Sequence, residues 1–136
     1  MIKITDDILN REAIIKSVEM DEVGGICTFI GTVRNKTKGR EVQYLEFETY
    51  QEMALKELMK IADTIYKKWP VKQIAIQHRV GKVAVGEDAV VIAIASAHRK
   101  EAFAACQYAI DTLKETVPIW KKEVFEDGEH WVSAHP

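Results

Sequence analysis

Five cationic residues in separate stretches of the sequence are the strongest candidates for chemistry. Arg34 ends one apolar run, His98 and Arg99 follow another, and Lys114 and Lys121 come later in the chain. A lysine that loses solvent has a lowered pKa and can then exchange protons near neutral pH. Arginine binds phosphate and carboxylate through paired N–H groups. Together these residues predict a cationic pocket for a phosphorylated or otherwise anionic substrate, with two lysines that move protons.

Each of these signals also has a simpler interpretation. A lysine in the last turn of a helix, such as Lys114, complements the helix dipole. Lys121 and Lys122 fit an edge strand that is protected by charge. His98–Arg99 fits ordinary capping and surface charge at a helix start. His78–Arg79 is likewise a histidine followed by an arginine after an apolar run, and there we favour a structural role.

One helix must position three of the candidate residues. Apolar residues recur at helical spacing through Ala102–Leu113, which predicts a helix with one buried face. Pro118 ends that helix. A straight helix separates Arg99 from Lys114 by about 22 Å, so the two cannot share a small-molecule site within one subunit. We expect two-fold packing of a dimer to bring one chain's helix start to the other chain's helix end.

Strands flank this helix on both sides. The apolar run Ala89–Ala97 predicts a central strand before it, and Ile119–Phe125 predicts a strand after it. Because side chains alternate along a strand, Lys121 shares a face with Ile119. If Ile119 points inward, Lys121 does too, and an inward lysine needs a partner or a ligand.

The other elements complete an α+β pattern. Ile26–Val33 and Val42–Tyr50 are predicted to pair as an antiparallel hairpin whose long, solvated tip is Arg34–Arg40. Strands, helices and hairpins alternate along the chain, which predicts an antiparallel or mixed sheet with packed helices rather than a parallel doubly wound sheet. The remaining predicted elements are a strand at Ile2–Ile4, a helix capped by Thr5 or Asp6, a helix at Glu52–Trp69, a strand at Val71–Val80, and a final hairpin of Ile119–Phe125 with Trp131–Val132 that turns at Asp127–Gly128.

Composition and charge narrow the class of protein. A chain of 136 residues, 47% of them hydrophobic, predicts one domain over residues 1–136 with a real core. The net charge of −2 points neither to nucleic acid nor to an anionic membrane. No apolar run reaches the roughly 20 residues that span a bilayer. Charges at Lys3, Asp6 and Asp7 argue against a secretory signal.

The usual catalytic and ligand-binding motifs are not found. Cys27 and Cys106 form no CxxC motif, which favours a reduced, cytoplasmic protein that uses both as small buried hydrophobes. No histidine has a second ligand at a recognised spacing, so we predict no metal and expect no cofactor. Gly24–Gly31 lacks the lysine and the spacing of a phosphate-binding loop.

Several longer segments, in this order and spacing, carry a family resemblance. They are FIGTVRN, YLEFETYQEMA, HRVGKVAVGE, SAHRKEAFAACQYAIDTLKETVPIWKKE and DGEHWV. The chain resembles the large, catalytic subunit of molybdopterin synthase, from about Gly25 to Val132. The resemblance implies a hammerhead-type α+β fold and a sulfurtransferase activity.

The resemblance also implies partners and a reaction. A homodimer would carry one small, ubiquitin-like sulfur-carrier subunit at each end, forming a heterotetramer. The carrier's C-terminal Gly-Gly thiocarboxylate would enter the pocket and pass sulfur twice to cyclic pyranopterin monophosphate, forming the dithiolene of molybdopterin.

Site residues follow from the matching positions. The catalytic pair would be Lys114 as the acid that protonates the leaving oxygen and Lys121 as the group that holds the thiocarboxylate and stabilises its oxyanion. Family members often carry an arginine where His135 stands, directed at the neighbouring subunit's pocket, and the histidine here either removes that contact or makes it pH-dependent. The implied substrate-binding residues are Thr32, Val33, Arg34, His98, Arg99, Lys122 and Glu123.

The alternative from another class is a non-catalytic α+β module that binds a phosphorylated metabolite in the same cationic pocket. Such a module needs no sulfur carrier. A purely structural dimerisation domain is a further alternative. Capture of a small protein that ends in Gly-Gly separates the enzyme from both.

Overall fold

The computed structural model describes residues 1–126 and 128–132. Its α+β class confirms the sequence prediction. In chain order, the described elements are β1 (Ile2–Thr5), α1 (Arg11–Lys16), β2 (Gly25–Thr32), β3 (Lys36–Thr37), β4 (Arg40–Thr49), α2 (Gln51–Lys68), β5 (Val71–Arg79), β6 (Gly81–Ala84), β7 (Asp88–Ser96), α3 (Arg99–Thr116), β8 (Ile119–Phe125) and β9 (Gly128–Val132).

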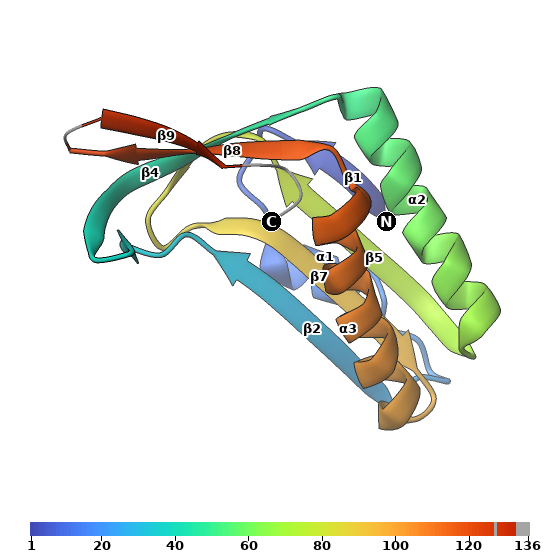
Figure 1. Ribbon diagram of the computed structural model, residues 1–136. Coiled ribbons are helices and arrows are strands. Elements are labelled where there is room, and N and C mark those ends of the chain that lie inside the picture. The colour runs from blue at the N-terminus through green and yellow to red at the C-terminus, as the bar shows by residue number, and fades with distance from the viewer. Residues whose placement is uncertain (127, 133–136) are drawn as a thin grey trace.

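Two sheets organise these elements. The first has the order β1-β5-β7-β2, in which β1 pairs with β5 in parallel and the other neighbours are antiparallel. The second has the order β3-β4-β8-β9, and β6 also pairs with β4. The second sheet lies across one end of the first, beyond the C-terminal end of α3 (Figure 1).

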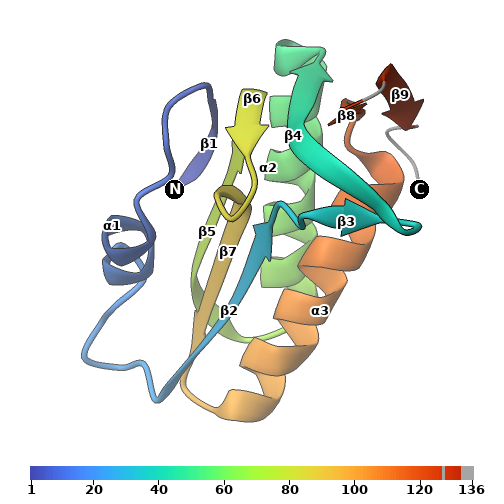
Figure 2. The ribbon, with the colours of Figure 1, turned by 90° about the vertical axis from the view of Figure 1, so that its left-hand side faces the viewer.

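Helices cover both faces of the first sheet. Figure 2 shows α1 on one side of the sheet and α2 and α3 together on the other. The larger core joins buried residues of α2 and α3, such as Leu58 and Leu113, to the sheet. The smaller core joins Ile14 of α1 to the opposite sheet face, where Ala93 lies. The sheet is therefore buried on both faces, which explains why β7 is apolar along almost its whole length.

Both long helices end where the sequence predicted. The helix α3 is followed by Val117 in an extended conformation (φ −83°, ψ 123°), because Pro118 disfavours a helical residue before it. Chain reversal at this point sends β8 back along β4. The C-terminal end of α3 and the start of β8 are thereby held close together.

The predicted hairpin of Ile26–Val33 with Val42–Tyr50 is wrong. The strand β2 pairs with β7 and β4 pairs with β8, so the two predicted partners belong to different sheets. The polar loop between them forms a small hairpin of its own, in which Thr37 faces Arg40. Its two turn residues, Lys38 and Gly39, both have positive φ (50° and 79°), the pattern of a tight two-residue turn.

The first helix begins later than predicted. Its N-cap is Asn10, whose side chain accepts a hydrogen bond from the Ala13 N–H, and neither Thr5 nor Asp6 caps it. Ile8 is consequently outside the helix and 72% exposed. In the final hairpin, β8 pairs with β9 as predicted, whereas Asp127 of the predicted turn lies outside the described residues. None of the described helices is long and apolar enough to cross a membrane.

Candidate active site

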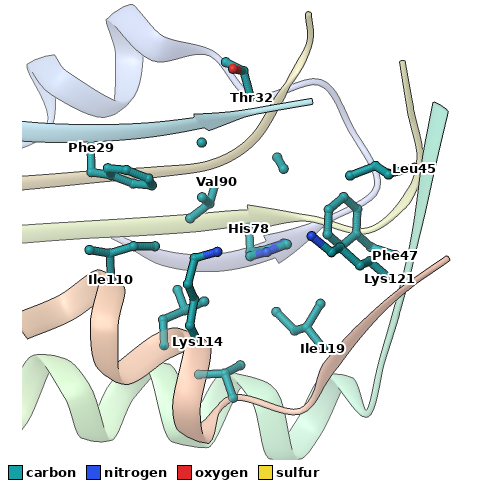
Figure 3. Close-up of a pocket in the computed structure, with 14 residues that line it drawn as sticks. Phe29, Thr32, Leu45, Phe47, His78, Val90, Ile110, Lys114, Ile119 and Lys121 are labelled. Carbon is teal, nitrogen blue, oxygen red and sulfur yellow. The ribbon is translucent and has the colours of Figure 1, made fainter. Parts of the chain in front are cut away.

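A cavity of about 160 Å³ opens where the two sheets meet the C-terminal end of α3 (Figure 3). Most of its wall is apolar, and its polar side chains are those of Thr32, His78, Lys114 and Lys121. Such a site holds a ligand by shape and orients it with a few polar groups. The full lining is Phe29, Gly31, Thr32, Leu45, Phe47, His78, Ala89, Val90, Ile110, Leu113, Lys114, Val117, Ile119 and Lys121.

Local structure brings the two lysines together. Lys114 occupies the last turn of α3, one turn beyond the buried Ile110. Ile119 is buried on β8, and strand alternation turns Lys121 to the same side, as predicted. The short connection through Pro118 thus delivers two amino groups to one cavity from the end of a helix and the start of a strand.

The surroundings of Lys121 disfavour its charge. Burial lowers the pKa of Lys121, the nearby Glu123 raises it, and the positive charges of Lys114 and Arg34 lower it again, with a lower pKa as the net result. A lysine with a lowered pKa releases and accepts a proton closer to neutral pH. Mutual repulsion of these cations also creates a place where an anion is stabilised.

Gly31 provides room in the cavity wall. A Cβ atom at this position would lie 2.7 Å from Cγ1 of Val90 and 3.3 Å from the ring of Phe29. The pairing of β2 with β7 also shifts register between Gly31 and Thr32. A larger residue would therefore have to displace neighbouring side chains at the point where β2 leaves the sheet.

The predicted substrate-binding residues divide into three groups. Thr32 lines the cavity, and Arg34 lies close enough to lower the pKa of Lys121 although it is exposed. Val33 beside them is buried in the core and is only 2% exposed, and its backbone N–H already donates to the Glu87 carbonyl, so neither its side chain nor its N–H is open to a ligand.

His98 and Arg99 form the second group. They lie at the first residues of α3, at the opposite end of the helix from the cavity, and both are exposed. The structure of one chain therefore does not bring them to Lys114, as the helix length predicted.

Lys122 and Glu123 form the third group, and β8 turns them to opposite faces. The Lys122 amino group lies 2.9 Å from a carboxylate oxygen of Glu46 and 3.6 Å from one of Glu129, outside the cavity lining. Glu123 is 6% exposed and shares the Lys121 face of the strand. Its charge acts on Lys121 from within the protein.

The two cysteines lie beside one another between β2 and α3. Burial, together with the charge and a hydrogen bond of Cys27, raises the pKa of Cys106 to about 12. A thiol with such a pKa is a poor nucleophile at neutral pH. Among the described residues, no cluster of three or more histidine, cysteine or carboxylate side chains could hold a metal ion.

His78 lines the cavity, a placement that the sequence did not predict. It shares a buried strand face with Ile74 and Ile76, and a histidine at the end of such a face looks like a core residue. The available signal was its position at the end of a buried strand, where a side chain can be both rigidly held and adjacent to a site.

Comparisons with known proteins identify the family of this chain. The family model described as "MoaE protein" matches residues 4–116. The molybdopterin synthase catalytic subunit of Bacillus subtilis (strain 168) is 51% identical over 130 residues, which cover 96% of this chain and 83% of the relative.

Solved structures agree as well. The crystal structure of molybdopterin synthase from Staphylococcus aureus superposes with a TM-score of 0.92 at 42% identity, covering 96% of this chain and 95% of that one. A complex of subunits 1 and 2 of molybdopterin-converting factor from Helicobacter pylori has a TM-score of 0.81 over 96% and 89% of the two chains. At 21% identity, this last likeness shows the fold alone. With its family match and its close relatives, the chain belongs to the MoaE protein family.

Proposed function

We propose that this chain, as one catalytic domain over residues 1–136, is the sulfur-transferring catalytic subunit of a molybdopterin synthase. It takes sulfur from the C-terminal Gly-Gly thiocarboxylate of a small ubiquitin-like carrier and passes it to cyclic pyranopterin monophosphate, which becomes the dithiolene of molybdopterin. The observation that carries the proposal is the cavity in which Lys114 and Lys121 meet. The cytoplasmic setting predicted from the sequence belongs to the same proposal.

The two lysines suit different steps of this reaction. A thiocarboxylate is an anion, and the cavity repels further positive charge but attracts an anion through Lys121, Lys114 and the nearby Arg34. Lys121 holds the thiocarboxylate and stabilises the oxyanion that forms when the carrier's acyl group is hydrolysed. Lys114 protonates the oxygen that leaves the pterin side chain when sulfur attacks its carbon. The carrier supplies the sulfur, so the inert Cys106 has no part in the transfer.

A second copy of the chain completes the site. His98 and Arg99 suit the phosphate of the substrate, yet they lie at the far end of α3. Two-fold packing that places the start of one α3 beside the end of the other supplies both halves, and two such sites with two carriers make a heterotetramer. Thr32 and Arg34 are proposed to add substrate contacts from the cavity side. Val33 and Glu123 are buried and Lys122 lies outside the cavity lining, so the substrate contacts that the resemblance implies for these three residues stay predictions. His135 lies outside the described residues, and its predicted cross-subunit contact stays a prediction.

The direct test mixes the purified chain with thiocarboxylated carrier and cyclic pyranopterin monophosphate and measures the dithiolene product. The wild type should form it, and Lys114→Ala should lower turnover by about 10²- to 10⁴-fold, the usual worth of a positioned acid. Lys60→Ala, an exposed lysine on α2 that does not line the cavity, is the matched control and should retain full turnover. A wild-type protein that binds a phosphorylated ligand but forms no product would instead support the non-catalytic binding module.

A further inference from the structure

His78 is the most deeply buried ionisable group of the cavity. It lies near the end of β5, paired with Val90 of β7 on one side and Ile4 of β1 on the other, and it is 5% exposed. The ring of Phe47, from the second sheet, meets it edge to face at 5.2 Å between centroids. Three strands and a ring from a fourth therefore hold the imidazole in one place.

The hydrogen-bond pattern defines which nitrogen of His78 carries the hydrogen. Nδ1 lies 2.7 Å from the carbonyl oxygen of Arg79. A carbonyl oxygen can only accept, so Nδ1 is the donor and Nε2 keeps a free lone pair. Burial, opposed in part by this hydrogen bond and reinforced by the charge of Lys114, lowers the pKa of His78 to about 4. The ring is therefore neutral at physiological pH, with Nε2 as an acceptor.

Acceptors are scarce in this cavity. Of the 14 lining residues, only Thr32 and His78 have side chains that accept a hydrogen bond, and Thr32 is exposed. Lysine ammonium groups only donate. Within the described part of the chain, no carboxylate forms an ion pair with Lys114 or Lys121. Among the lining residues, the His78 ring is the one buried side-chain acceptor, and the buried Glu123, whose charge acts on Lys121, does not line the cavity.

Lys114 is the lysine placed to donate a hydrogen to Nε2 of His78. Figure 3 shows the amino ends of Lys114 and Lys121 on either side of His78. The charge of Lys114 also acts on His78. The structure records no hydrogen bond between the two, but Lys114 has a flexible four-carbon stem, and catalytic hydrogen bonds often tighten only when reactants bind.

We propose that His78 is a positioning residue for the sulfur transfer, whose Nε2 accepts a hydrogen from the amino group of Lys114 and directs that group at the leaving oxygen. This role rests on the proposed function, and it adds a member to the site that the two lysines define. His78 does not touch the reacting atoms. Its hydrogen bond restricts the Lys114 side chain to one rotamer, which raises kcat without changing how tightly the substrate binds.

Two substitutions separate the two nitrogens. In His78→Asn, the side-chain amide takes the place of Nδ1 and still donates to the Arg79 carbonyl, but nothing reaches the position of Nε2. In His78→Gln, an amide oxygen reaches the Nε2 position and restores an acceptor. We expect His78→Asn to lower kcat about tenfold with KM values for carrier and substrate within about twofold, and His78→Gln to recover kcat to within about threefold of the wild type.

Either of two kinetic results overturns the role. One is a His78→Asn protein with wild-type kcat. The other is equal loss in both variants, which indicates a structural role of the ring. Thermal melting shows whether each variant folds. If the wild type itself forms no dithiolene, the proposed function fails and this role with it, whereas normal wild-type turnover with an unaffected His78→Asn removes this role alone.

If a variant does not fold, a measurement on the wild-type chain without substrate tests the same role. Nitrogen-15 NMR of the wild-type chain, with His78 assigned, should show a neutral ring protonated on Nδ1 from pH 8 down to about pH 5. A ring protonated on Nε2, or a charged ring at pH 7, leaves no acceptor for Lys114 and overturns the proposal.

Discussion

The two ends of α3 carry similar charges but very different surroundings. At the C-terminal end, Lys114 faces a cavity that is walled by both sheets and shared with Lys121 and His78. At the N-terminal end, His98 and Arg99 are exposed, and the cavity does not extend to them. One end thus lies in a walled cavity, and the other presents two basic side chains on an open surface.

This difference shows what one copy of the chain can and cannot do. At the cavity end, burial and repulsion by Lys114 and Arg34 disfavour the charge of Lys121, as its lowered pKa shows. The exposed end lies against solvent, which screens its charges. An exposed arginine gains specificity only when something else surrounds the anion that it binds. The comparison therefore predicts a site completed by a second copy, with each end of α3 serving a different cavity.

The largest expected effect contrasts two adjacent lysines at the cavity end. Lys121→Ala should lower turnover by about 100-fold or more, because it removes a donor from the oxyanion. Lys122→Ala, on the opposite face of β8 and paired with Glu46, should change turnover by less than about threefold. Steady-state assay of dithiolene formation measures both. Equal losses of turnover would mean that Lys122 contacts the substrate directly, as the family resemblance implies. Lys121 and Lys122 would then both act in the reaction although they lie on opposite faces of β8.

A mixing experiment tests whether the two ends of α3 meet across a dimer. Arg99→Ala and Lys114→Ala should each be defective alone. After unfolding and refolding together, about a quarter of all sites should contain one intact half from each chain, and activity should return to that level. A mixture of Lys114→Ala with Lys121→Ala is the control, because both changes damage the same end and no site is repaired. Recovery in the control but not in the test mixture would contradict the shared site.

The smallest expected effect is on stability. Lys121→Met should raise the free energy of unfolding by roughly 1 kcal/mol at neutral pH, since it removes a charge that burial disfavours. The folded-state pKa of Lys121 lies below its unfolded value of 10.5, so the unfolded chain binds more protons between these values and the wild type gains stability as pH rises through them. The advantage of Lys121→Met should therefore vanish near pH 10.5.

The matched change at the other end of the helix is Arg99→Met. Arg99 is exposed, so its replacement relieves no burial and should not stabilise the chain. Urea unfolding of both variants over a range of pH compares the two ends directly. Stabilisation of similar size in both variants would show that burial in the cavity does not disfavour the charged form of Lys121.

Local patterns predicted the parts of the site that lie close together in sequence. Alternation with Ile119 predicted that Lys121 faces inward, and Pro118 predicted the end of α3, because both depend on neighbouring residues. Pairing between distant strands could not be read in the same way. The proximity of β2 and β4 in sequence suggested a hairpin, yet β2 pairs with β7 as an edge strand of the first sheet, a pairing across many residues that no local pattern indicates.

His78 shows the same limit at the level of one residue. Its neighbours in sequence predict a core position, which is correct as far as burial goes. Its contact with the cavity depends on Phe47 from the second sheet and on the end of α3. Such a role emerges only when three distant segments are placed together, whereas the exposed cations were visible as charges in the sequence.

The high pKa of Cys106 has a consequence for the proposed sulfur transfer. At pH 7, a thiol with a pKa of about 12 is ionised in only about one molecule in 10⁵. In the proposed reaction, a thiolate at this position would attack the acyl carbon of the carrier's thiocarboxylate, form a thioester and release hydrosulfide. By keeping Cys106 protonated, the packing of β2 against α3 would prevent this loss of the carrier's sulfur as hydrosulfide.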